Sequence, residues 1–155
     1  MKALCFTGHR PEKLPWGADE RAESCLGFLA RLREELRKAV ANGYTTFLTG
    51  MAEGIDLIAA REVLALRESN PEIRLIAVLP YPRRGNASFY AVKNAADEVV
   101  LLSREYYTGC LFQRNRYLVD HSDAVLAVYA GGGGGTKQTI EYARSVGKPV
   151  KVLRP

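Results

Sequence analysis

Residues 124–141, AVLAVYAGGGGGTKQTIE, place an apolar segment, five consecutive glycines and a helical segment in direct succession. The unbroken apolar run at 124–129 is typical of a strand that is buried on both faces. Bare backbone before a helix lets amide N–H groups approach an anion, and the helix dipole favours negative charge there. The stretch therefore predicts a phosphate-binding loop made of Gly132, Gly133, Gly134, Gly135 and Thr136.

Thr136 stands where the predicted helix begins. We expect it to cap this helix and to offer its hydroxyl to the phosphate. The alternative for the glycine run is a flexible connection without a ligand, because loops often carry glycine for conformational reasons alone. Five glycines are costly to order, however, and a solvent-exposed loop does not need them.

The same alternation of apolar and helical segments extends along the rest of the chain. Strands are predicted at residues 2–7, 45–49, 74–79, 98–102, 124–129 and 149–153, and helices at 18–42, 54–69, 86–97, 111–120 and 136–145. Continuous apolar strands that alternate with helices favour a parallel sheet covered on both faces. We therefore expect one α/β domain over residues 1–155, a Rossmann-like, doubly wound and mostly parallel sheet with helices on both faces.

Ligands of such sheets bind at the carboxyl ends of the strands, near the point where the strand order reverses. The first predicted strand ends there in TGHRP at residues 7–11. Arg10 can pair with a phosphate, and His9 can donate or shuttle a proton near neutral pH. We take Gly8, His9 and Arg10 as candidate ligand-binding residues, with a plain surface turn as the alternative.

Two more segments carry candidate site residues. In TGMAEGID at 49–56, a carboxylate that faced a phosphate would repel it, so Glu53 or Asp56 should meet sugar hydroxyls or a base edge. Glu53 is also the candidate catalytic acid or base. For Asp56 the alternative is simple stabilisation of a helix start. With Arg114 as a second cation for the phosphate, the ligand-binding candidates from these segments are Gly50, Glu53, Asp56, Arg114 and Asn115.

Composition narrows the classes of function. The chain has a net charge of +5 and a sequence pI of about 9.2, but its basic residues are spread out, so an anionic small ligand explains the balance as well as nucleic acid does. Three cysteines and two distant histidines form no metal-ligand pattern, and no metal site is predicted. No apolar run is long enough for a membrane helix, and a cytoplasmic location is expected.

Four motifs together resemble the YpsA-like family of the SMF/DprA–LOG (SLOG) superfamily. They are TGHRP at 7–11, TGMAEGID at 49–56, RNRYLVDHSD at 114–123 and GGTKQTIEYA at 134–143, and the resemblance runs from Leu4 to Val152. It implies a Rossmann-like domain that binds nucleotides or nucleotide-derived ligands at the glycine-rich edge. It also makes a homodimer plausible.

Two branches of that superfamily imply more specific activities. LOG enzymes are phosphoribohydrolases with a PGGxGTxxE motif, whereas this chain has Ala130 before the glycines and Thr139 in place of the glutamate, leaving Glu53 as the substitute carboxylate. The DNA-processing branch has a comparable Gly-x-x-x-Gly-Ile-Asp stretch and binds single-stranded DNA.

We therefore predict a sensor that binds a nucleotide, a dinucleotide or a related phosphorylated ligand, with no other cofactor implied. A nucleoside-monophosphate phosphoribohydrolase, in which a carboxylate steers water to the anomeric carbon, is the first alternative. A single-stranded nucleic-acid module that uses the same positive edge is the second, less favoured alternative.

Overall fold

The computed structural model describes residues 2–155 as one six-stranded sheet with five α-helices. The strands are β1 (Lys2–Gly8), β2 (Tyr44–Thr49), β3 (Arg74–Leu79), β4 (Glu98–Leu101), β5 (Ala124–Val128) and β6 (Val150–Leu153). The helices are α1 (Glu23–Ala41), α2 (Ile55–Arg67), α3 (Ala87–Ala95), α4 (Cys110–Asp120) and α5 (Gly135–Ser145), with a short 3-10 helix η1 (Pro11–Lys13) after β1.

The sheet has the order β4-β3-β2-β1-β5-β6, and every neighbouring pair is parallel. From β1 the chain adds strands in one direction as far as β4, and then it crosses back to place β5 on the other side of β1. This is the Rossmann-like, doubly wound α/β fold that the sequence predicts. The predicted "mostly parallel" sheet is entirely parallel in the described residues.

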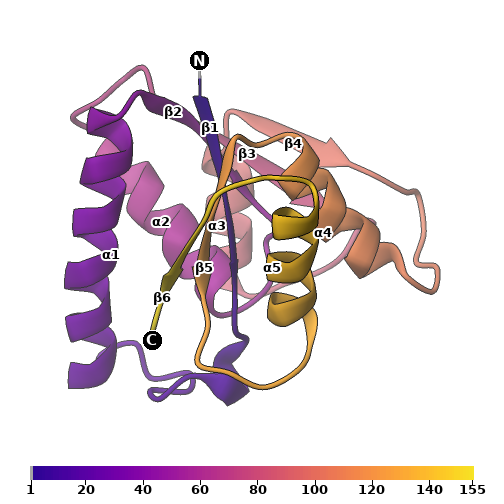
Figure 1. Ribbon diagram of the computed structural model, residues 1–155, viewed down its shortest axis with the longest axis horizontal. Coiled ribbons are helices and arrows are strands. Elements are labelled where there is room, and N and C mark those ends of the chain that lie inside the picture. The colour runs from indigo at the N-terminus through magenta and orange to yellow at the C-terminus, as the bar shows by residue number, and fades with distance from the viewer. Residues whose placement is uncertain (1) are drawn as a thin grey trace.

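Two apolar clusters hold the helices on opposite faces of the sheet (Figure 1). One cluster packs α1, α2 and α3 against side chains such as Phe6, Phe47 and Leu126. The other packs α4 and α5 against Cys5, Leu48 and Val125. Successive residues of a strand point to opposite faces, so a strand covered on both sides is buried throughout, as all five residues of β5 are.

Helix α1 begins later than predicted, at Glu23 instead of residue 18. Residues 14–22 form a series of turns, and within them the Asp19 carboxylate accepts a hydrogen bond from the Arg21 N–H at 3.1 Å. Such a local side-chain bond offers the backbone an alternative to the helix. The turns also bury Trp16, whose ring stacks on Phe28 of α1 at 5.3 Å between ring centroids.

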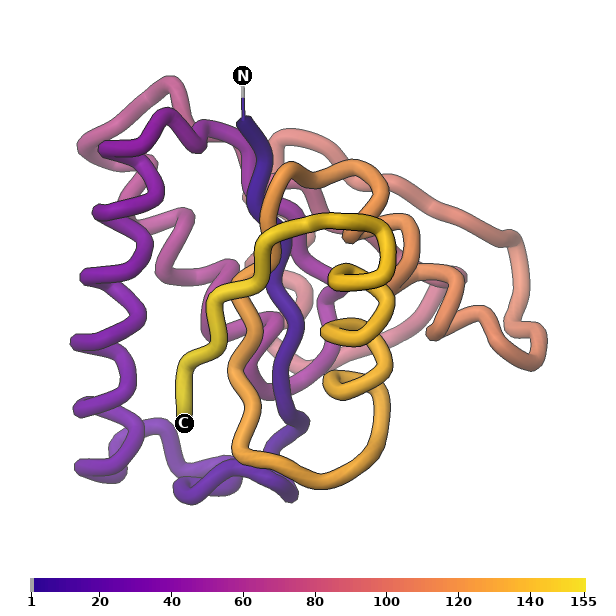
Figure 2. Tube along the Cα trace, in the orientation of Figure 1, coloured from indigo at the N-terminus to yellow at the C-terminus, as the bar shows by residue number. Residues whose placement is uncertain are grey.

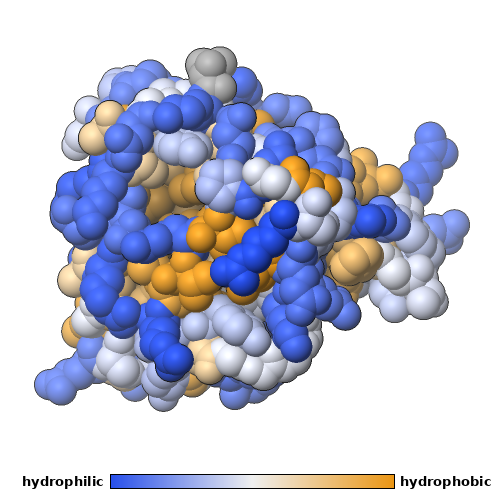
Figure 3. Space-filling view, viewed as in Figure 1, coloured by the Kyte–Doolittle hydropathy of each residue, from blue (hydrophilic) through white to orange (hydrophobic). Residues whose placement is uncertain are grey.

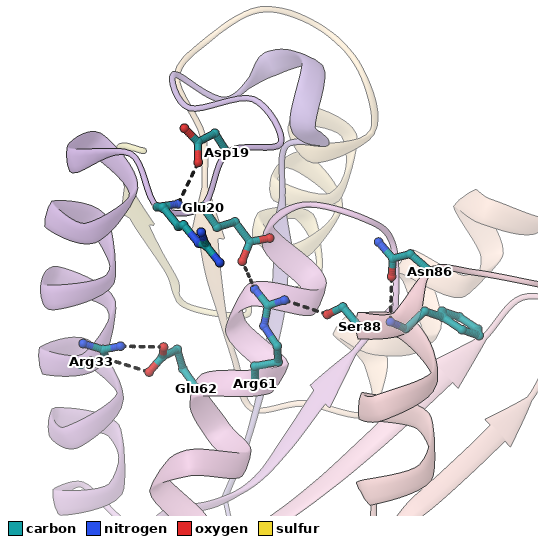
Figure 4. A network of polar contacts seen from close by, with 9 residues as sticks. Asp19, Glu20, Arg33, Arg61, Glu62, Asn86 and Ser88 are labelled. Carbon is teal, nitrogen blue, oxygen red and sulfur yellow. Dashed lines mark hydrogen bonds and ion pairs between the residues drawn. The ribbon is translucent and has the colours of Figure 1, made fainter.

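Polar contacts join the helices of the first face to one another (Figure 4). Arg33 of α1 forms two hydrogen bonds to the Glu62 carboxylate of α2, at 2.8 and 3.1 Å. Arg61 of α2 donates to the Ser88 hydroxyl of α3 at 2.8 Å and also pairs with Glu20. These groups are partly exposed, so each pair contributes only about 0.2–1 kcal/mol to stability.

Strand β6 forms one edge of the sheet beside β5. Figure 3 shows apolar surface in the region between α1 and α5, with hydrophilic residues around it. Within residues 2–155, no helix combines the length and apolar character needed to cross a bilayer.

Candidate functional site

A cavity of about 460 Å³ opens at the carboxyl ends of the central strands. It lies where β1 and β5 meet, which is the point at which the strand order reverses and where sheets of this class place their ligands. Its walls are formed by the end of β1, by η1, by the loop before α4, and by the first residues of α2, α4 and α5. The lining residues discussed below are Gly8, His9, Arg10, Glu12, Lys13, Asp56, Tyr106, Cys110, Leu111, Phe112, Arg114, Asn115, Gly133, Gly135, Thr136 and Gln138.

Nine of the thirteen candidate ligand-binding residues line this cavity together: Gly8, His9, Arg10, Asp56, Arg114, Asn115, Gly133, Gly135 and Thr136. Four others, Gly50, Glu53, Gly132 and Gly134, are not part of the lining. Gly50 contacts a lining residue instead, because its carbonyl accepts a hydrogen bond from the Arg114 guanidinium. The structure thus gathers residues from four separate segments of sequence around one space.

Hydrogen bonds connect the glycine loop to the segment after β1, and Figure 2 shows the two segments running at the same end of the molecule. The Ala130 N–H donates to Nε2 of His9 at 3.0 Å, and Lys13 Nζ donates to the Gly133 carbonyl at 3.2 Å. The Tyr129 hydroxyl donates to the Gly132 carbonyl. These bonds connect Ala130, Gly132 and Gly133 to the side chains of His9, Tyr129 and Lys13.

Helix α5 begins at Gly135, with Gly134 as its N-cap and no side-chain cap. The prediction that Thr136 caps this helix was wrong, because the helix starts one residue earlier and places Thr136 in its first turn. Thr136 is instead buried in the cavity wall. The first N–H groups of an α-helix have no intrahelical acceptor, so this end offers donors to an anion.

Asp56 and Arg114 form the floor of the cavity and are 7% and 4% exposed. Asp56 Oδ2 accepts a hydrogen bond from the Ala52 N–H at 3.2 Å. Burial raises the pKa of Asp56, and the positive charge of Arg114 and this hydrogen bond oppose that rise. Arg114 Nε donates to Oδ1 of Asn115 at 2.9 Å, which fixes the guanidinium beside the cavity.

Burial, with a smaller contribution from Lys13, lowers the pKa of His9 from its ordinary value of 6.5. Because Nε2 accepts from the Ala130 N–H, the neutral ring carries its proton on Nδ1. His9 therefore holds the glycine loop in place at neutral pH. This role differs from the proton shuttle that we expect from the sequence.

Glu53 is exposed and lies outside the lining, although it is only three residues from Asp56. Gly54, with φ of +94°, turns the chain between them just before α2 begins. The carboxylates that do line the cavity are Asp56 and Glu12. Of the two carboxylates in this segment, Asp56 lines the cavity and Glu53 does not.

Sequence reasoning missed several lining residues, among them Glu12, Lys13, Cys110, Phe112 and Gln138. Lys13 is the most consequential, because it adds a cation beside the glycine loop. A signal for its position was present: Pro11 is a favoured first residue of a short helix, and one helical turn carries Lys13 back toward the sheet edge. Among residues 2–155, no group of three or more His, Cys, Asp or Glu side chains could hold a metal ion.

Comparisons with known proteins agree with this architecture. The family model described as the YspA SLOG family matches residues 4–148. A UPF0398 protein of Bacillus velezensis is 30% identical over 139 residues, covering 83% of this chain and 75% of its own. The uncharacterized SPbeta prophage-derived protein YoqJ of Bacillus subtilis is 28% identical over 117 residues, covering 63% of this chain and 68% of its own.

A solved structure of DNA processing protein A from Helicobacter pylori, described for its single-stranded DNA binding mode, shares the fold with a TM-score of 0.67. The two sequences are 19% identical. The match covers 98% of this chain but only 65% of the Helicobacter chain, which is the longer of the two.

Proposed function

Because this chain belongs to the YspA SLOG family, we propose that it binds a nucleotide or nucleotide-derived phosphorylated ligand in the cavity between β1 and β5 and acts as a sensor of that ligand. One observation carries the proposal: the open helix start after the glycine loop shares a single cavity with Arg10, Lys13 and Arg114. Amide donors and several cations around one space are the chemistry that recognises a phosphate.

The location of the cations supports an anion over a neutral ligand. Lys13 lies in η1, and Arg10 is the residue just before η1. Arg114 lies in α4, so the three charges reach the cavity from two separate segments of the chain. Thr136 adds a hydroxyl from the first turn of α5. A phosphate at the helix start would receive hydrogen bonds from α5 and charge from its neighbours.

Binding without turnover is favoured by the position of Glu53. The hydrolase alternative requires a carboxylate beside the anomeric carbon of a bound nucleotide. Glu53 is exposed and is not among the residues that line the cavity, so the carboxylate that the sequence suggests for that role lacks support from the cavity lining. In this proposal Asp56, a carboxylate that does line the cavity, contributes to binding of the ligand and not to hydrolysis.

A second candidate function, binding of single-stranded nucleic acid, is favoured by the exposed Tyr106 and Phe112 beside these cations. Aromatic side chains next to positive charge suit unpaired bases. The Helicobacter structure, which is described for its single-stranded DNA binding mode, supports the candidate at the level of fold.

Calorimetric titration with inorganic phosphate, ribose 5-phosphate and nucleoside 5′-monophosphates tests the proposal. We expect saturable binding of at least one phosphorylated compound, and at a free concentration of about 100 times Kd it should stabilise the protein by about 2.7 kcal/mol. Binding of none of these compounds would overturn it. Release of free base during the titration, followed by chromatography, would favour the hydrolase alternative instead.

A further inference from the structure

The lining of the cavity combines apolar groups with groups that bind anions. The apolar and aromatic part comes from one stretch before and at the start of α4: Tyr106, Cys110, Leu111 and Phe112. Of the cations, Arg10 and Lys13 come from η1 with its preceding residue and Arg114 comes from α4, while the glycine loop and the start of α5 supply backbone N–H groups. A ligand that fills the cavity therefore meets both apolar surface and anion-binding groups.

Tyr106 is the most exposed aromatic residue of this stretch, at 60%. Its ring packs against Tyr81 in a T-shaped contact, with centroids 5.5 Å apart and an interplanar angle of 87°. This contact fixes the ring while most of the side chain stays accessible at the cavity. Phe112 is less available, because the Arg116 guanidinium lies 5.3 Å from its ring centroid.

Asp56 lies on the floor and has spare hydrogen-bond capacity. Its Oδ2 accepts from the Ala52 N–H, and the residue lines the cavity. A carboxylate has acceptor positions for about four hydrogen bonds, so it can still accept from hydroxyl groups. A carboxylate at this place disfavours a second phosphate but suits a sugar.

We infer that the ligand is a nucleoside 5′-monophosphate, bound with its phosphate at the start of α5, its sugar hydroxyls toward Asp56 and its base against Tyr106. The inference deepens the proposed function and rests on it. A flat apolar group, a hydroxyl-bearing group and a single phosphate match the three kinds of lining: the aromatic Tyr106, the carboxylate of Asp56 and the start of α5. Stacking of a base on an aromatic ring raises affinity by about five- to 150-fold.

The experiment compares ribose 5-phosphate with AMP, GMP, CMP and UMP, using calorimetry on the wild-type protein and three variants. Tyr106→Ala removes the stacking surface, and Tyr106→Phe retains it. Tyr107→Ala is the matched control, because Tyr107 is the next residue, is 44% exposed and is not part of the cavity lining.

We expect at least one nucleotide to bind about tenfold more tightly than ribose 5-phosphate, in keeping with one stacked base. Tyr106→Ala should abolish that advantage while leaving the affinity for ribose 5-phosphate unchanged. Tyr106→Phe and Tyr107→Ala should bind like the wild type. Circular dichroism of all variants should be unchanged, because both tyrosines are exposed.

Equal affinities of the wild type for ribose 5-phosphate and all four nucleotides would overturn the inference and leave the proposed phosphate site standing. A loss of nucleotide affinity in Tyr107→Ala equal to that in Tyr106→Ala would also overturn it. Binding of no phosphorylated compound would overturn both proposals. An oligonucleotide that binds in a Tyr106-dependent way while all monophosphates fail would replace the mononucleotide with single-stranded nucleic acid.

Discussion

His9 accepts a hydrogen bond at Nε2 from the backbone N–H of Ala130, 3.0 Å away and 121 positions later in the chain. The bond connects the end of β1 to the start of the glycine loop. It requires a neutral imidazole, because a doubly protonated ring has no acceptor. The shape of the loop is thereby linked to the protonation of one buried residue.

Stability should fall with acidification because of His9. Its pKa in the folded protein is lowered, chiefly by burial, so the unfolded chain takes up the proton first as the pH falls below 6.5. The stabilisation is complete above that pH and is lost as the pH falls through the folded-state pKa. Urea unfolding of the wild type between pH 8 and pH 5 should show a steeper decline than that of His9→Gln, which keeps an acceptor but does not titrate. Parallel declines would contradict this role.

Removal of the Lys13 charge should weaken phosphate binding. Lys13 lines the cavity, and its exposed Nζ donates a hydrogen bond to the Gly133 carbonyl. We therefore expect Lys13→Ala to weaken the binding free energy by roughly 1 kcal/mol, which raises Kd about fivefold. Lys137→Ala is the control, since Lys137 lies on the first turn of α5 but outside the lining. Calorimetry with ribose 5-phosphate compares the two. A larger loss in Lys137→Ala would place the anion elsewhere.

A side chain at position 134 should strain the loop. Gly134 has a φ of +110°, and a Cβ there would lie 3.2 Å from Lys13 Nζ. Gly134→Ala should therefore cost about 1–2 kcal/mol in the free energy of unfolding. The φ of Gly133 lies outside the left-handed region, and a Cβ there would have no neighbouring atom within 4 Å. Gly133→Ala should therefore leave the free energy of unfolding nearly unchanged. Urea unfolding distinguishes them, and equal effects would show that conformational strain is absent.

Loss of Arg114 should destabilise the cavity floor. Arg114→Met removes the hydrogen bond to the Gly50 carbonyl and the charge that opposes the desolvation of Asp56, at a cost of about 2–3 kcal/mol. The double variant Arg114→Met/Asp56→Asn should recover part of that loss, because no buried carboxylate then remains. Unfolding free energies of the two single variants and the double variant form the test. Strict additivity would mean that the two residues are not coupled.

Alanine at position 8 should be far less tolerated than alanine at position 27. A Cβ on Gly8 would lie 2.4 Å from Ile55 Cγ2, so Gly8→Ala forces α2 away from β1 and should cost about 1–3 kcal/mol. Gly27 is an exposed position inside α1 with open space around it, and Gly27→Ala should add about 0.5–1 kcal/mol. Opposite shifts in melting temperature are expected. A neutral Gly8→Ala would show that the close approach is dispensable.

The succession of elements was accessible from the sequence for a simple reason. A strand buried on both faces, such as Ala124–Val128, is apolar without interruption, and each helix is marked by its spacing and its end signals. The start of α1 was not accessible, because Ala18, Glu20 and Arg21 are good helix formers, whereas the hydrogen bond from the Arg21 N–H to the Asp19 carboxylate that accompanies the turn is known only from the structure.

The site was predictable in outline and not in its individual side chains. Loops at the ends of parallel strands must converge, which brings Gly8, Arg10, Asp56 and Gly133 together. The choice between Glu53 and Asp56 depended on the turn at Gly54, which sends one carboxylate outward and the other inward. The role of Lys13 depended on a partner 120 positions away, and no local pattern reveals that.

Strand β1 occupies the middle of the sheet, hydrogen-bonded to β2 on one side and to β5 on the other. During synthesis on a ribosome its second edge stays unpaired until residue 128 has emerged, although the strand itself is made first. The nascent chain can thus form β1 to β4 early, whereas the cavity is complete only after the residues of β5, the glycine loop and the start of α5 have been synthesised.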